Sequence, residues 1–183
     1  MSSDPEPRPE FSRMLAPDRL GMAPVEEDIA ADAEERAALA ERFDLLAMER
    51  LTANLRLDPV PGKPLLRLSG RIAARVTQRC VVSLEPVHSD LEEAFSQLYT
   101  LDPAADGADG ADVVVEAEAE EPPEPVGAGG IDLGEVVAQH LAIALNPYPR
   151  APGAHMPPEG SGAAEEPSSA SPFSVLKSLK PQP

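Results

Sequence analysis

An alternation of apolar and polar residues between Leu66 and Arg79 constrains the fold of this chain more than any other feature. The even positions carry Leu66, Leu68, Gly70, Ile72, Ala74 and Val76, and the odd positions carry Arg67, Ser69, Arg71, Ala73, Arg75, Thr77 and Arg79. Because successive side chains of a strand point to opposite faces, this run predicts a long strand whose even side chains face a core and whose odd side chains face water. A single strand of this length is unusual, so Gly70 predicts a β-bulge.

Further strands are predicted on either side of this run. Residues 51–58 alternate in the same way, and the turn residues of 59–64, which include Gly62, separate them from the long strand. The sequence SLEPV predicts the next turn at Pro86, and residues 90–101 follow as another strand. A short edge strand is predicted at 112–116.

Two regions have helical spacing. From Val25 the sequence VEEDIAADAEERAALAERFDLLAMERL predicts one helix with a break near Asp44, or two helices, with acids crowded into the first turn. Residues 131–145 predict a second helical region, with Asp132 as N-cap and an end at Asn146-Pro147. We therefore predict an α+β fold in which a curved antiparallel sheet is flanked by an N-terminal helical segment and a C-terminal helix.

The distribution of proline and acid predicts a single domain with disordered acidic and proline-rich tails. Residues 1–24 hold five prolines and residues 147–183 hold nine, and such segments bury too little apolar surface to offset their ordering entropy. We predict a flexible leader at 1–24, in which Phe11, Met14 and Leu15 dock weakly, and one α+β domain at 25–150. Within that domain, residues 102–130 carry nine acids and predict a largely flexible insertion. Residues 151–183 predict a disordered tail with a short apolar-basic motif, SPFSVLKSLK.

Positive charge is concentrated in one segment of an acidic chain. The formal net charge is -17, yet no Asp or Glu lies between Asp58 and Glu85. This segment holds a basic set of five residues: Lys63, Arg67, Arg71, Arg75 and Arg79. Arginine forks bind phosphate oxygens, so one interpretation is an RNA-contacting stripe, and the other is a solvated sheet face balanced by acids on neighbouring strands. The overall acidity argues against non-specific RNA affinity, so any contact must be local.

Several other classes of site lack support in the sequence. Cys80 is the only cysteine, so no internal disulfide forms, and a catalytic thiol would need an oriented base. No ligand spacing for zinc and no phosphate-binding loop is present, so we predict no enzyme, no metal, no cofactor and no small-molecule substrate. The polar N-terminus and the lack of a long apolar run predict a cytoplasmic protein without membrane contact.

Two motifs resemble the YceD family, which is named for accumulation of large-subunit ribosomal RNA. The first is LSGRIAARV followed by CVVSLEPV, which contains Gly70, Cys80, Leu84, Glu85 and Pro86. The second is the helix that begins at Ile131, Asp132 and Leu133 and leads into NPYPR. The version found here resembles the alphaproteobacterial branch, and the resemblance covers about residues 25–154.

One departure from the family pattern limits what the resemblance implies. Family members carry a second cysteine and a preceding arginine where this chain has Ser83 and Val82. Two thiolates can share a soft metal ion, whereas Cys80 with a neutral serine cannot do so comparably. A metal suspected for the family is therefore not carried over to this chain.

The resemblance implies a non-enzymatic factor in ribosome assembly whose partners are large-subunit ribosomal RNA, ribosomal proteins or both. The basic set would supply a local RNA contact. The alternative is an acidic adaptor that binds basic ribosomal proteins without touching RNA. Carboxylates capping all the arginines would favour the adaptor, and one open positive patch would favour RNA binding.

Overall fold

The computed structural model describes residues 9–21, 23–102 and 122–155. Two compact units divide the chain, Met1–Ala151 and Pro152–Pro183; in the second, only residues 152–155 are described. The segments predicted at 112–116 and at 171–180 lie outside the described residues. The domain boundaries drawn from the sequence stay a prediction.

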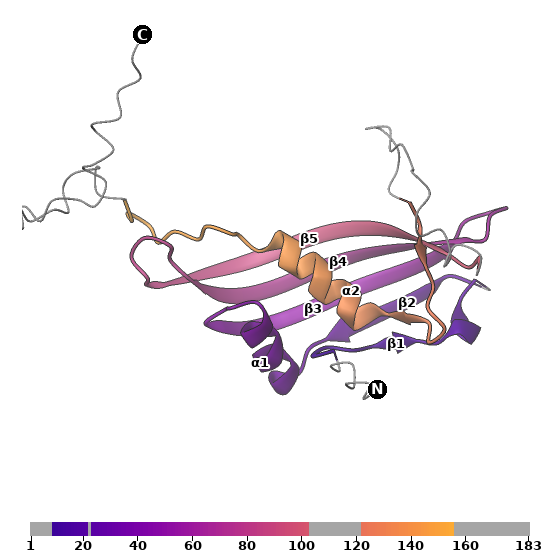
Figure 1. The fold of residues 1–183 in the computed structure, drawn as a ribbon, viewed down its shortest axis with the longest axis horizontal. Helices are drawn as coiled ribbons and strands as arrows, with labels where there is room; N and C mark the ends of the chain where they lie inside the picture. The colour runs from indigo at the N-terminus through magenta and orange to yellow at the C-terminus, as the bar shows by residue number, and fades with distance from the viewer. Residues whose placement is uncertain (1–8, 22, 103–121, 156–183) are drawn as a thin grey trace, which may run out of the picture. The chain divides into compact units, whose positions relative to one another are not determined.

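A five-stranded sheet with the order β2-β3-β4-β5-β6 forms the centre of the first unit (Figure 1). Its strands are β2 (Val25–Ala30), β3 (Ala47–Pro59), β4 (Leu65–Arg79), β5 (Pro86–Thr100) and β6 (Glu124–Pro125). All neighbours are antiparallel except β5 and β6. The predicted α+β fold with a curved, mostly antiparallel sheet is confirmed.

The predicted faces of the long strand are confirmed with one exception. Leu66, Leu68, Ile72, Ala74 and Val76 are buried, and the four arginines on the other face are exposed. Thr77, expected to face water, is buried. Its hydroxyl donates to Glu49 at 2.7 Å and lies 2.8 Å from Nδ1 of His88, so side chains from β3 and β5 cover it.

The bulge predicted at Gly70 is wrong. Gly70 stays in continuous register with Leu55 on β3 and Phe95 on β5, and the ladder is interrupted instead between Met48 and Arg50. A Cβ on Gly70 would lie 2.8 Å from Cδ2 of Leu55 and would collide with the Phe95 ring. Glycine is needed here because its neighbours' side chains occupy the space.

The N-terminal helical prediction holds only for its middle. The helix α1 spans Ala33–Arg42, while Val25–Ala30 form β2 and the residues from Ala47 belong to β3. Asp32 accepts from the backbone N–H of Glu34 and Glu35, and Glu35 accepts from the Asp32 N–H, which makes a capping box. The helix therefore begins at Ala33, whereas the acidic residues at 26–28 predict an earlier first turn. The predicted break near Asp44 is the end of the helix and not an interruption within it, because Asp44 has a φ of 51° and the residues after it enter β3 instead of a second helix.

Asp132 starts the second helix, α2 (Leu133–Ala144), and also holds the N-terminal segment. Its carboxylate accepts from the N–H groups of Gly134 and Glu135, as predicted for an N-cap. The same carboxylate accepts from the Ser12 hydroxyl at 2.6 Å and from the Arg13 N–H at 2.7 Å. Beside it, β1 (Met14–Leu15) pairs with β7 (Ile131–Asp132).

The N-terminal segment is packed more tightly than weak docking would require. Phe11 and Leu15 are each only 1% exposed, whereas Met14 is 55% exposed. Both buried residues belong to the same apolar core as Leu39 of α1 and as Val137 and Leu141 of α2. The helices and this segment thus cover one face of the sheet, and no helix of the described residues is long and apolar enough to cross a lipid bilayer.

The space around Gly70 leads to a stability prediction. Gly70→Ala should lower the free energy of unfolding by about 1–3 kcal/mol, because overpacking outweighs the gain in strand propensity. Urea denaturation measures this, with Ser69→Ala on the opposite face as the control. Adding Phe95→Leu to Gly70→Ala should restore part of the loss; a Gly70→Ala protein as stable as the wild type would contradict the packing argument.

Candidate nucleic-acid interface

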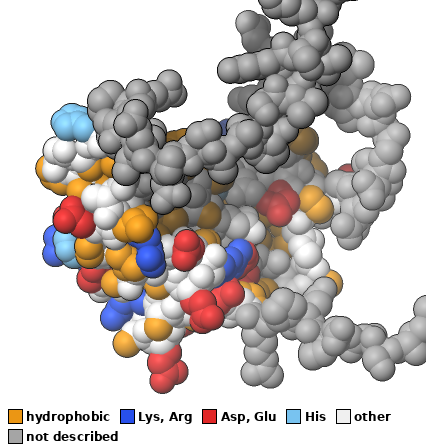
Figure 2. Space-filling view, turned by 60° about the vertical axis from the view of Figure 1, so that its left-hand side comes forward, with side chains coloured by type: hydrophobic (Ala, Val, Ile, Leu, Met, Phe, Trp, Pro, Cys, Tyr) orange, Lys and Arg blue, Asp and Glu red, His pale blue; other side chains and the backbone are white. Residues whose placement is uncertain are grey.

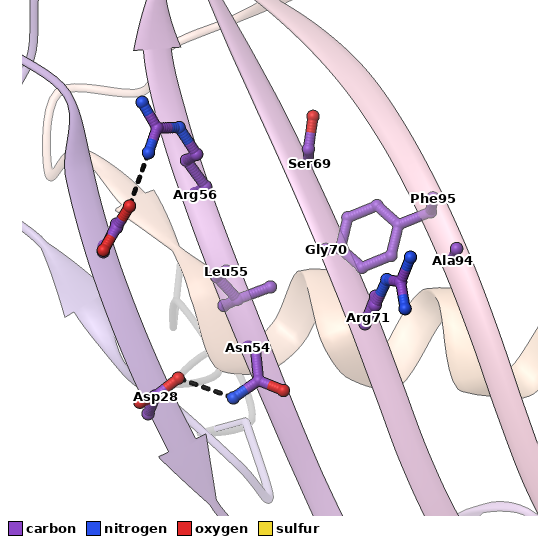
Figure 3. Close-up of a pocket in the computed structure, with 10 residues that line it drawn as sticks. Asp28, Asn54, Leu55, Arg56, Ser69, Gly70, Arg71, Ala94 and Phe95 are labelled. Carbon is purple, nitrogen blue, oxygen red and sulfur yellow. Dashed lines mark hydrogen bonds and ion pairs between the residues drawn. The ribbon is translucent and has the colours of Figure 1, made fainter.

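One face of the sheet carries no helix from the described part of the chain, and we call it the open face. Its residues come from β2, β3, β4 and β5, whose registers place Asp28, Asn54, Arg71 and Ala94 in one row across four strands. Figure 3 shows these side chains in front of the strands, with α2 behind the sheet. The open face is therefore an accessible surface built on a rigid sheet.

The arginines predicted as an RNA stripe lie in a line on this face. Arg67, Arg71, Arg75 and Arg79 are all exposed and follow β4 at every fourth residue, a spacing of about 13 Å at the rise of a strand. Lys63 is exposed in the turn between β3 and β4. The structure thus brings four of the five predicted cations onto one strand face and places the fifth in the turn that leads into that strand.

Arg75 differs from the other members of the set because it has a carboxylate partner. Its guanidinium donates to Asp90 at 2.8 and 3.1 Å, and Arg50 lies 4.0 Å from the same carboxylate. The hydrogen bond and charge of Asp90 raise the pKa of Arg75, and the hydrogen bond from Arg75 lowers the pKa of Asp90. Asp90 reaches Arg75 because the two residues are directly opposite in the ladder.

The remaining cations have no such partner within the described residues. Arg67, Arg71, Arg79 and Lys63 form no ion pair there. Phosphate could therefore approach them without first displacing a carboxylate.

Acids nevertheless interleave with the arginines of the open face. Arg56 on β3 pairs with Asp58 at 2.9 Å and with Glu26 at 2.5 Å, and Asn54 donates to Asp28. Figure 2 shows cationic and anionic side chains intermingled on one side of the molecule. The open face is a mixed surface through which a line of arginines runs.

Arg71 stands beside two hollows in this face. One, of about 480 Å³, is lined by ten residues that include Asn54, Arg56, Ser69 and Arg71, with Gly70 between the last two (Figure 3). The other, of about 390 Å³, also includes Asn54 and Arg71 and extends to Glu92 and Glu93. Arg71 thus lines both hollows.

The sequence argument for the basic set left out two residues of this surface, Asn54 and Arg56. Their positions were signalled by the alternation of residues 51–58, which placed them on the polar face of a strand. Their place beside Arg71 and Ser69 depends on the pairing of β3 with β4. Pairing register cannot be read from either strand alone.

Cys80 lies in a tight turn at the end of β4, opposite the start of β5. Its side chain is fully buried, and its sulfur accepts from the backbone N–H of Val82, Ser83 and Ala151 at 3.3–3.4 Å. A further backbone bond, from Val81 N–H to Pro149 O at 2.9 Å, ties the segment after α2 to the same turn. Cys80 therefore fastens the NPYPR segment to the sheet.

These donors favour the thiolate. Hydrogen bonding from the Ser83 side chain, followed by the N–H groups of Ser83, Ala151 and Val82, lowers the pKa of Cys80 from 9.0 to about 6, although burial opposes this change. Within the described residues no group of three or more His, Cys, Asp or Glu side chains is placed to hold a metal ion.

The other family-motif residues have separate structural places. Leu84 occupies the turn with a φ of 62° and is 65% exposed, and Glu85 accepts from the Cys80 N–H through its carbonyl. Pro86 begins β5, so the turn predicted at Pro86 lies just before it. Ile131 and Leu133 are buried on either side of Asp132. These positions stabilise the fold and project no common set of functional side chains.

The lowered pKa of Cys80 predicts a pH dependence of stability. Since the folded-state pKa lies below the unfolded value, this group's contribution is fully present above about pH 9, falls with pH, and is lost below about pH 6. The difference in unfolding free energy between wild type and Cys80→Ala should therefore grow from pH 6 to pH 9. Urea denaturation at several pH values tests this, and a constant difference would contradict the thiolate.

Comparison with known protein families agrees with the resemblance indicated by the two motifs. Residues 68–180 match the model of the family described as Large ribosomal RNA subunit accumulation protein YceD. No curated protein matches the chain. No solved structure matches it either. The assignment to the alphaproteobacterial branch stays a prediction. The matched span covers more than half of the chain and includes β4 from Leu68, the Cys80 turn, β5 and α2, so this protein belongs to the YceD family.

Proposed function

We propose that this protein supports the accumulation of large-subunit ribosomal RNA as a non-enzymatic factor that contacts the RNA through the open face of its sheet. Arg67, Arg71 and Arg79 supply the contact, with Arg75 and Lys63 beside them. The observation that carries the proposal is the line of exposed arginines on β4, three of which have no carboxylate partner within the described residues.

The electrostatics of the chain suit a local contact. A net charge of -17 repels polyanions at long range, while guanidinium groups bind phosphate at short range through paired hydrogen bonds. RNA would be held only where its shape lets phosphates reach the arginine line. The acids of β2 and β5 beside that line would penalise any other placement.

A second candidate is an adaptor that binds basic ribosomal protein without touching RNA. It is favoured by the Arg75–Asp90 pair and by the ion pairs of Arg56, because these carboxylates neutralise part of the stripe. The sequence analysis contrasted two patterns, carboxylates that cap all the arginines and one open positive patch. The described residues match neither pattern in full.

RNA binding over a salt series distinguishes the two candidates. The double variant Arg67→Gln/Arg71→Gln should weaken binding to large-subunit RNA by about tenfold and reduce the salt slope by about 1.4, since each phosphate contact on single-stranded RNA contributes about 0.7. Filter binding measures both quantities.

The matched control is Arg19→Gln/Arg42→Gln, which removes the same charge from two arginines that are paired with Glu27 and Glu135. Its salt slope should stay at the wild-type value. Equal losses in both double variants would mean that net charge alone matters, and no loss in either would favour the adaptor.

A further inference from the structure

Within the described residues, the outer edge of β5 is unpaired over most of its length. The strand runs from Pro86 to Thr100, yet β6 pairs only with Tyr99 and Thr100. Figure 1 shows β5 along one border of the sheet. At the opposite border, β2 is shorter, and Arg13 donates to the Ala30 carbonyl while Arg19 pairs with Glu27. Among the described strands, β5 therefore offers the longest free edge.

The hydrogen bonds at both ends of the β4–β5 ladder show which β5 residues face outward. Cys80 N–H donates to Glu85 O at one end, and Leu101 N–H donates to Pro64 O at the other. Because hydrogen-bonded pairs alternate along an antiparallel ladder, the odd-numbered residues of β5 bond to β4. The even-numbered residues direct their N–H and C=O groups outward, and the Thr100 carbonyl, which accepts from Val126 N–H, agrees with this phase.

Within the described residues, the free backbone groups thus belong to five residues whose side chains lie on the open face: His88, Asp90, Glu92, Ala94 and Ser96. They recur at every second residue, which is the spacing that another extended chain presents. Ala94 and Ser96 are small and exposed, so their side chains leave the edge accessible.

The side chains along this edge favour a basic partner. Glu92 is exposed on the open face and Glu93 on the opposite face, and within the described residues neither forms an ion pair. No Lys or Arg occurs between Cys80 and Pro149. On the face of Glu93, Leu91 and Phe95 are only partly buried against the core. A strand that alternates basic and apolar residues would match both faces.

The same charges disfavour pairing with a second copy. In an antiparallel pair of two β5 edges, Glu92 and neighbouring acids would come close to their own copies, and like charges opposite each other are destabilising. A lysine- or arginine-rich strand would instead meet opposite charge.

We propose that the β5 edge binds an extended, Lys/Arg-rich segment of a basic protein by adding it to the sheet as a further strand. Main-chain hydrogen bonds to the outward-facing residues from His88 to Ser96 provide the affinity, and Glu92 on the open face provides the preference for cations. This site is separate from the arginine line on β4 and does not depend on RNA binding by it.

A synthetic peptide of about ten alternating lysines and valines tests the proposal by fluorescence anisotropy. The first control carries N-methyl groups on every second amide, which keeps the charge and removes donors that face β5. The second control replaces lysine by glutamate. We expect the unmodified lysine–valine peptide to bind, the N-methylated peptide to bind at least about tenfold more weakly, and the glutamate peptide not to bind. Equal binding of the methylated peptide would reduce the interaction to charge alone and overturn strand addition.

Variants of the full chain locate the site. Ala94→Pro removes one outward N–H without touching the β4 ladder and should weaken peptide binding, while the matched variant Ala94→Ser keeps that N–H and should bind normally. Glu92→Gln should weaken binding of the lysine peptide and reduce the salt dependence of that binding. Wild-type binding by Ala94→Pro, confirmed as folded by circular dichroism, would overturn the proposal.

Two further readouts separate the possible failures. If Ala94→Pro does not fold, the methylated peptide on the wild-type protein still decides the question. A wild-type protein that dimerises in sedimentation, and becomes monomeric on Ala94→Pro, would make a second copy the occupant and overturn the proposal. Peptide binding by the Arg67→Gln/Arg71→Gln protein should not be weakened, so loss of the arginine contact and loss of the peptide contact are distinguishable.

Discussion

The pairing of β4 along both of its edges is the constraint on which the rest of this structure depends. Every residue from Leu66 to Thr77 is placed against both β5 and β3. The backbone of the strand is therefore paired on both edges within the sheet, and the alternation of side chains fixes which face is apolar. A shift of one residue would expose Leu66 and Leu68 and bury the arginines, at a large cost in desolvation.

The apolar face of β4 then determines where the other elements lie. Helices α1 and α2 and the segment around Phe11 cover it, and Asp132 links two of these layers because one carboxylate caps α2 and binds Ser12 and Arg13. Cys80 has the equivalent role at the far end of the strand, where its sulfur receives the N–H of Ala151. Among the described residues, the fold thus covers one face of the sheet and leaves the other exposed.

The features that could be predicted from the sequence are those that depend on local periodicity. The faces of β4 and the N-cap at Asp132 follow from patterns within a few residues. Residues 25–30 were misassigned to a helix because Ile29 fits both periods, and its place in a strand depends on pairing with Ala53. Gly70 resembled a bulge for a similar reason, since the space that requires glycine is occupied by Leu55 and Phe95 from other strands.

The sequence by itself determined that this protein has a two-faced strand, that four arginines share one face of it, and that the chain resembles the YceD family. Only the tertiary structure decided which of those arginines meets a carboxylate. Within the described residues Arg75 does, and Arg71 does not, because the register places Asp90 opposite the first and Ala94 opposite the second. The physical reason is that side-chain direction follows from the backbone of a single strand, whereas an ion pair requires two strands to be brought into one alignment.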